Sequence, residues 1–161
     1  MPTFDVDIQR DVDVAEALVA QLQTAVETTL RQQQVEPPAA LSLLLTGDEQ
    51  IRQLNRDYRG LDQPTDVLSF PAGEALPGMA EAEPYLGDVV ISVPYAARQA
   101  QAGEHTLAAE LQLLAVHGVL HLLGYEDEKP EQRQAMWAAQ AAVLAHLGVS
   151  ITLPTEDEYG G

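Results

Sequence analysis

The chain has 161 residues, which is enough for one domain with its own hydrophobic core. It has no cysteine, which excludes disulfides and thiolate zinc sites, so any bound metal must use histidine and carboxylate ligands. Eight basic residues against 25 acidic ones leave a net charge of −17, and this charge should repel nucleic acid at long range unless a local basic surface exists.

The sequence also bears on membranes and location. No apolar run is long enough to cross a bilayer. The first residues, MPTFDVDIQR, lack the basic start and the apolar segment of a signal peptide. We therefore expect a cytoplasmic protein with no membrane partner.

In the first half of the chain, strands and helices are expected to alternate. The segment FDVDIQ alternates apolar and polar residues as a half-buried strand does, and the run LSLLL has the continuous apolar character of a buried strand. Two prolines and a later glycine supply helix breaks. The predicted elements are a strand at 4–9, a helix at 13–33, a strand at 41–45, a helix at 48–58 and a strand at 65–70.

The second half is expected to be mainly helical. A loop rich in Gly, Pro and Glu at 72–85 leads to a strand at 86–92. Three helices should follow, at 95–101, 106–123 and 131–147. This order predicts one mixed sheet with helices packed on it, forming a single domain at 1–153, with an acidic flexible tail at 154–161.

The segment HGVLHLLGYED at 117–127 is the strongest chemical signal. His117 and His121 are four residues apart on a predicted helix, so their side chains point the same way and can bind one ion. Gly124 ends the helix and lets a following carboxylate fold back as third ligand; Glu126, Asp127 and Glu128 all lie within reach. Three protein ligands are typical of a catalytic zinc site, although the same histidine spacing also occurs in hydrogen-bonded core pairs.

This segment differs from the HExxH motif of metalloproteases. That motif has a glutamate after the first histidine as general base, and here the position is Gly118. The expected nucleophile is instead a metal-activated water, which suits phosphodiester hydrolysis helped by a separate cation.

Three of the eight basic residues form a candidate cationic stripe. Arg52, Arg56 and Arg59 are spaced i, i+4, i+7 on one face of the predicted helix at 48–58 and its end. The stripe fits phosphate binding, because guanidinium groups contact phosphate through two parallel hydrogen bonds. The alternative is a solvated helix face paired with nearby acidic residues.

Three blocks of sequence resemble the YbeY family of endoribonucleases. They are NRDYRGLDQPTDVLSFP at 55–71, LGDVVIS at 86–92 and ELQLLAVHGVLHLLGY at 110–125. The resemblance covers about residues 41 to 147 with the blocks in order. It implies an α+β fold with a mixed four-stranded sheet and a zincin-like metal helix.

The resemblance also implies a function and the residues for it. The family is associated with maturation of the 3′ end of small-subunit (16S) rRNA and with ribosome quality control, so we expect a single-strand-specific, metal-dependent endoribonuclease acting on ribosomal RNA precursors. It implies one divalent metal, most often zinc, on His117, His121 and the position of Asp127. Arg59 matches the family's essential arginine, which makes it the expected catalytic residue.

The sequence departs from the family pattern at two positions, and two further residues are expected to support the metal site. The family's third ligand is usually histidine, and Asp127 adds a negative charge there; Leu61 stands where the family often has lysine. His105 matches a family histidine and is expected to support the site. Glu110 lies seven residues before His117 on the same helix face and is expected to do so too.

Two other functions fit the same residues less well. A peptidase or amidase could use the same metal, and a non-catalytic ribosome-assembly factor could hold a structural metal. The net charge of −17 makes a basic small-subunit ribosomal protein a plausible partner beside RNA, and an assembly GTPase is a second expected partner.

Overall fold

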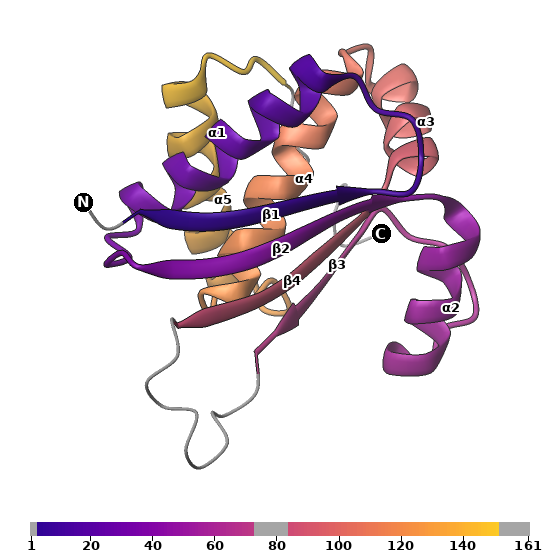
Figure 1. Cartoon of the computed structure of the whole chain (residues 1–161), viewed down its shortest axis with the longest axis horizontal. Coiled ribbons are helices and arrows are strands. Elements are labelled where there is room, and N and C mark those ends of the chain that lie inside the picture. The colour runs from indigo at the N-terminus through magenta and orange to yellow at the C-terminus, as the bar shows by residue number, and fades with distance from the viewer. Residues whose placement is uncertain (1–2, 73–83, 152–161) are drawn as a thin grey trace.

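The computed structural model describes residues 3–72 and 84–151 (Figure 1). The predicted tail at 154–161 and most of the predicted loop at 72–85 lie outside the described residues. The predicted domain end at 153 lies outside them as well, so this boundary stays a prediction.

Nine elements follow one another in the described residues, in the predicted order. Their bounds differ from the predicted ones by up to three residues. The elements are β1 (Phe4–Arg10), α1 (Glu16–Gln32), β2 (Ala39–Thr46), α2 (Asp48–Arg59), β3 (Val67–Pro71), β4 (Tyr85–Ser92), α3 (Val93–Gly103), α4 (Leu107–Leu122) and α5 (Pro130–Leu147).

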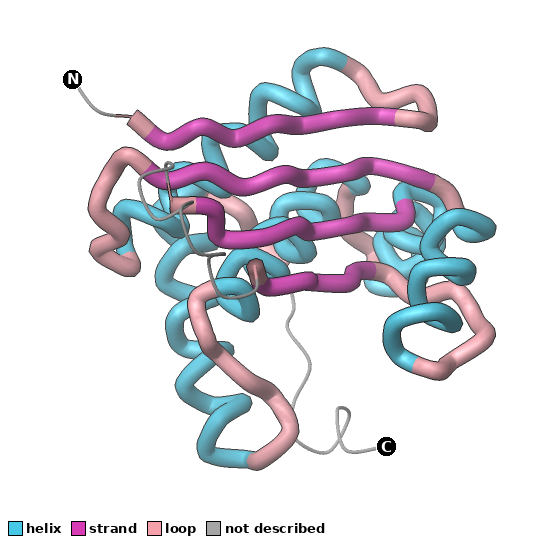
Figure 2. The backbone as a smooth tube through the Cα atoms, turned by 60° about the horizontal axis from the view of Figure 1, so that its bottom comes forward, coloured by secondary structure: helices cyan, strands magenta, loops and turns pink. Residues whose placement is uncertain are grey.

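The four strands form one mixed sheet in the order β1-β2-β4-β3. β1, β2 and β4 run parallel to one another, and β3 runs antiparallel to β4. Figure 2 shows the strands side by side, with β1 and β3 at the two edges. The prediction of an α+β fold with a mixed four-stranded sheet and helices packed on it is confirmed.

Most helices cover one face of the sheet (Figure 1). α1 and α4 pack on this face and on each other, and α5 packs against both of them. α2 lies apart from them, where its Ile51 joins Leu68 of β3 and Val90 of β4 in a small separate cluster. α4 is therefore the central helix, between the sheet and α5, and residues on it can face a site built by both.

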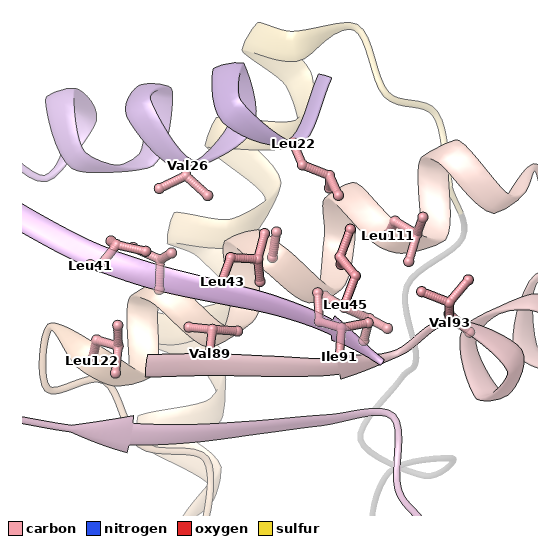
Figure 3. Close-up of a cluster of buried hydrophobic side chains, with 14 of the residues drawn as sticks. Leu22, Val26, Leu41, Leu43, Leu45, Val89, Ile91, Val93, Leu111 and Leu122 are labelled. Atoms are coloured by element: carbon pink, nitrogen blue, oxygen red, sulfur yellow. The ribbon is translucent and has the colours of Figure 1, made fainter. Parts of the chain in front are cut away.

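The main core lies between the sheet and the α1–α4 layer (Figure 3). Alternate residues of β2, namely Leu41, Leu43 and Leu45, are buried there, as the two-residue period of a strand requires. Val89 and Ile91 of β4 continue the same layer. Full burial of such side chains stabilises the fold by about 1.5–3 kcal/mol each.

A second core cluster holds α5 against α4. Met136, Val143 and Leu144 of α5 are buried with Val116 and Leu120 of α4. These three α5 residues follow helical spacing, so one face of α5 is anchored along its length. The same face contains residue 140, which becomes important at the site below.

No helix in the described ranges combines the length and the apolar character needed to cross a membrane.

Candidate metal centre

α4 supplies the two histidines of the centre. Thr106 caps the start of this helix, and its hydroxyl accepts a hydrogen bond from the backbone N–H of Ala109 at 3.0 Å. One turn separates His117 from His121, and their ring centroids lie 4.7 Å apart with the planes at 78°. The two rings therefore converge edge-to-face, as the sequence spacing predicts.

Gly118 allows α4 to approach the sheet closely. A Cβ atom at this position would lie 2.6 Å from Cγ1 of Val89 on β4, closer than real Cβ contacts. The hydroxyl of Ser69 on β3 also donates a hydrogen bond to the carbonyl of Gly118 at 3.0 Å. A glutamate does not fit here unless the helix or Val89 shifts, so this close packing is incompatible with the metalloprotease base at position 118.

A glycine turn after α4 returns the chain to the histidines. Gly124 has φ of +103°, which residues with a Cβ rarely adopt, and its N–H donates to the carbonyl of His121 at 3.0 Å. Tyr125 follows, and its hydroxyl donates to Oε1 of Gln33 at 2.9 Å, which ties the turn to the end of α1. Asp127 thereby comes back over the helix end.

Three ligand atoms meet at this point. Nε2 of His117 and Nε2 of His121 are 3.2 Å apart, and Oδ2 of Asp127 lies 3.7 Å from the first and 3.6 Å from the second. Tetrahedral zinc with bonds of about 2.0–2.1 Å separates its ligands by about 3.3 Å, so these distances fit one ion with modest adjustment. Among the described residues this is the group whose geometry could hold a metal.

The two histidines have different electrostatic surroundings. Burial lowers the pKa of His117, and the charge of neighbouring His121 lowers it further. The hydrogen bond to Asp127 raises the pKa of His121 against a smaller opposing effect of burial.

Gln140 of α5 also contacts the centre, and the sequence did not predict this. Its Oε1 lies 2.9 Å from Nδ1 of His117, and the residue is 3% exposed. A glutamine on an Ala-rich helix 23 residues beyond the histidine shows no motif, so only the docking of α5 reveals the contact.

A cavity of about 790 Å³ opens beside the three ligands. Its walls also include Arg59, Glu126, His105 and Glu110, so four more residues that the sequence analysis named lie around one space. The predicted catalytic arginine and the predicted metal ligands, about 60 residues apart in the sequence, are thus brought to the same cavity.

Arg59 is held firmly although it is exposed. Its Nη2 donates to the carbonyl of Ser69 on β3 at 2.7 Å. The guanidinium also lies over the ring of Phe70, 4.9 Å from the ring centroid. The end of α2 and the edge strand β3 together orient this group at the cavity wall.

The other two arginines of the predicted stripe differ from Arg59. Arg52 pairs with Glu49 at 2.7 Å and with Asp62, and Arg56 pairs with Asp57 at 3.0 Å. In the described part of the chain, neither of them belongs to the cavity wall. Their positive charge is thus largely balanced by acidic neighbours, and RNA binding by these two stays a prediction.

His105 and Glu110 form a buried pair on another part of the wall. Nε2 of His105 and Oε1 of Glu110 are 2.6 Å apart, with the side chains 13% and 6% exposed. Burial raises the pKa of Glu110, and the hydrogen bond from His105 opposes this effect. The pair links the connection between α3 and α4 to the first turn of α4, and a supporting role for these two residues stays a prediction.

The fold and this site together define a candidate metal-dependent hydrolase of the α+β class. The sequence model of the family described as Endoribonuclease YbeY matches residues 5–148. The chain belongs to the endoribonuclease YbeY family. Endoribonucleases hydrolyse RNA phosphodiester bonds, and the prediction of this family and enzyme class is confirmed.

Individual relatives agree with this assignment over nearly their whole length. The chain is 45% identical over 146 residues to the endoribonuclease YbeY of Moorella thermoacetica, covering 88% of this chain and 94% of the relative. It is 40% identical to that of Desulforamulus reducens, covering 89% and 95%. A solution structure of a protein from Thermotoga maritima has the same fold, with a TM-score of 0.62 at 23% identity and 88% of each chain covered.

Proposed function

We propose that this chain is a single-strand-specific, metal-dependent endoribonuclease that matures the 3′ end of small-subunit (16S) rRNA and takes part in ribosome quality control. The family supports the endoribonuclease activity and a role in rRNA processing. The observation that carries the metal-dependent mechanism is the meeting of Arg59 with the His117, His121 and Asp127 group at one cavity.

The residues at the cavity suit the cleavage of a phosphodiester. His117, His121 and Asp127 would hold a divalent metal, with zinc the proposed ion, and this metal would supply a Lewis acid and lower the pKa of a bound water. Arg59 binds the non-bridging oxygens of the phosphate, where negative charge grows toward the transition state, and its contacts with β3 orient it beforehand. A helix with two histidines one turn apart gives the site a zincin-like character without the protease base.

Substrate access also favours an unpaired strand. The cavity is a local recess in an acidic molecule of net charge −17, and paired RNA is a rigid, highly charged rod. A single strand can bend so that one phosphate reaches Arg59 while its neighbours stay further out. Arg52 and Arg56, once released from their acidic partners, are proposed to hold those flanking phosphates.

The acidic surface also suits a protein partner. A basic small-subunit ribosomal protein is the proposed partner because charge complementarity speeds encounter and selects the partner, and an assembly GTPase is the second proposed partner. The proposed substrate implies action in the cytoplasm. A peptidase function is not favoured, because the close packing of Gly118 against Val89 leaves no room for the usual base.

Metal analysis coupled to a cleavage assay tests the proposal. Purified wild-type protein should hold about one divalent ion per chain, and His117→Ala and His121→Ala should hold none. Wild type should cut an end-labelled small-subunit precursor within its 3′ extension, and a chelator or either substitution should stop this. Annealing a complementary strand over the extension should protect it.

Two results would contradict the proposal. Full metal content in both histidine variants would exclude the metal site. Equal cleavage of the paired and unpaired extension would exclude the single-strand preference.

A further inference from the structure

Gln140 is a buried polar residue at the metal centre to which the proposed chemistry gives no role. It lies on α5 and is 3% exposed, yet its side-chain oxygen Oε1 lies 2.9 Å from Nδ1 of His117. Burying an amide is unfavourable unless it is hydrogen-bonded, so the contact with His117 offsets a desolvation cost that a leucine at the same position would not have.

The contact determines which nitrogen of His117 carries the proton. An amide oxygen can only accept a hydrogen bond, so Nδ1 of His117 must be the donor. A neutral imidazole has one N–H, which leaves Nε2 with a free lone pair. Nε2 is the atom that lies 3.2 Å from Nε2 of His121 and 3.7 Å from Oδ2 of Asp127.

We infer that Gln140 is a positioning residue that holds the His117 ring in the Nδ1–H form, with Nε2 ready to bind the metal. The inference rests on the metal centre of the proposed function and adds a residue that does not itself bind the ion. A metal-binding histidine whose second nitrogen loses its partner typically loses about 10- to 100-fold in metal affinity.

Packing on both sides makes Gln140 a fixed support. Met136 lies one turn before it, and Val143 and Leu144 lie one turn after it, all buried against α4. This packing fixes the face of α5 from which the amide reaches His117. Metal affinity should consequently depend on the docking of α5, although α5 contributes no ligand of its own.

The experiment compares two substitutions at Gln140 with a matched control. Gln140→Met removes the acceptor at similar volume, and Gln140→Glu retains a hydrogen-bond acceptor. Gln112→Met is the control, because Gln112 is also a buried glutamine, on α4, with its amide bound to the carbonyl of Ala108 at 3.1 Å. Zinc affinity is measured by competition with a chelator, and the His117 tautomer of the metal-free protein by ¹⁵N NMR.

The inference predicts a distinct pattern. Gln140→Met should bind zinc about 10- to 100-fold more weakly than wild type and lose the pure Nδ1–H tautomer. Gln140→Glu and Gln112→Met should both stay within about threefold of wild type, since one keeps the acceptor and the other leaves His117 untouched.

The outcomes separate this inference from the proposed function. If wild-type protein binds no zinc, the proposed metal centre fails, whereas an Nδ1–H tautomer in the same protein would still support the role of Gln140. If Gln140→Met matches Gln112→Met in zinc affinity and in tautomer, the inference is wrong. If Gln140→Met does not fold, a His117 ring protonated on Nε2 in wild type would overturn it instead.

Discussion

Replacing Arg59 tests the cavity most directly, because Arg59 is the cationic group that we propose contacts the scissile phosphate. Arg59→Ala removes the charge and its donors. Arg59→Lys keeps the charge but loses the planar fork that contacts phosphate through two bonds. Neither change touches the ligands His117, His121 and Asp127, so metal content should stay at the wild-type level in both variants.

The structure sets the size of both expected effects. Arg59 is oriented by its 2.7 Å bond to Ser69 and by the ring of Phe70, so it acts as a preorganised donor. Loss of such a donor costs about 3 kcal/mol of transition-state stabilisation, or about 150-fold in rate. Because the group is exposed, losing the hydrogen bond and the cation–π contact should lower the free energy of unfolding by only about 1–2 kcal/mol.

Single-turnover cleavage of the precursor RNA measures the rate, and urea unfolding measures the stability. Arg31→Ala is the control, because Arg31 is an exposed arginine on α1 that pairs with Glu27 at 3.2 Å and is not among the described residues of the cavity wall. It should cleave at the wild-type rate. Cleavage by Arg59→Ala at the rate of Arg31→Ala would refute the role of Arg59.

Three further predictions concern the metal centre and its support. Asp127→Ala should lose the metal and Asp127→His should retain it in elemental analysis; full metal in the alanine variant would mean another third ligand. Gly118→Ala should lower the free energy of urea unfolding by about 1–2 kcal/mol, because the gain in helix propensity does not offset the 2.6 Å approach to Val89, and unchanged stability would contradict that packing. Burial raises the pKa of Glu110, which faces His105 in the cavity, so the folded state binds this proton more tightly than the unfolded state does. The free energy of unfolding should therefore fall as pH rises from 4.5 through the raised pKa. Urea unfolding measured across this pH range should show that the free energy of unfolding falls less in Glu110→Gln than in wild type. If it falls equally in both proteins, Glu110 does not cause the pH dependence.

The sequence alone determined most of the secondary structure and pointed to the candidate metal ligands. Strand and helix periods are local properties, and β2 and α4 therefore appear close to their predicted bounds. His117 and His121 converge because residues four apart on a helix share a face, and Gly124 with its positive φ marks the turn that returns Asp127. The choice of Asp127 over its acidic neighbours came from the family resemblance, and the ligand distances agree with it.

Only the tertiary structure decided the features that depend on contacts between elements. The three arginines of the stripe look equivalent in the sequence. In the structure, Arg59 donates a hydrogen bond to Ser69 of β3, whereas Arg52 pairs with Asp62 in the loop after α2. In the sequence, Gly118 shows only that the metalloprotease base is absent, whereas the structure shows that a Cβ there would clash with Val89 of β4. Gln140 belongs to no sequence motif, and its contact with His117 is seen only in the structure. Helical period states which side of a helix a residue faces, but the neighbour on that side is set by how whole elements pack.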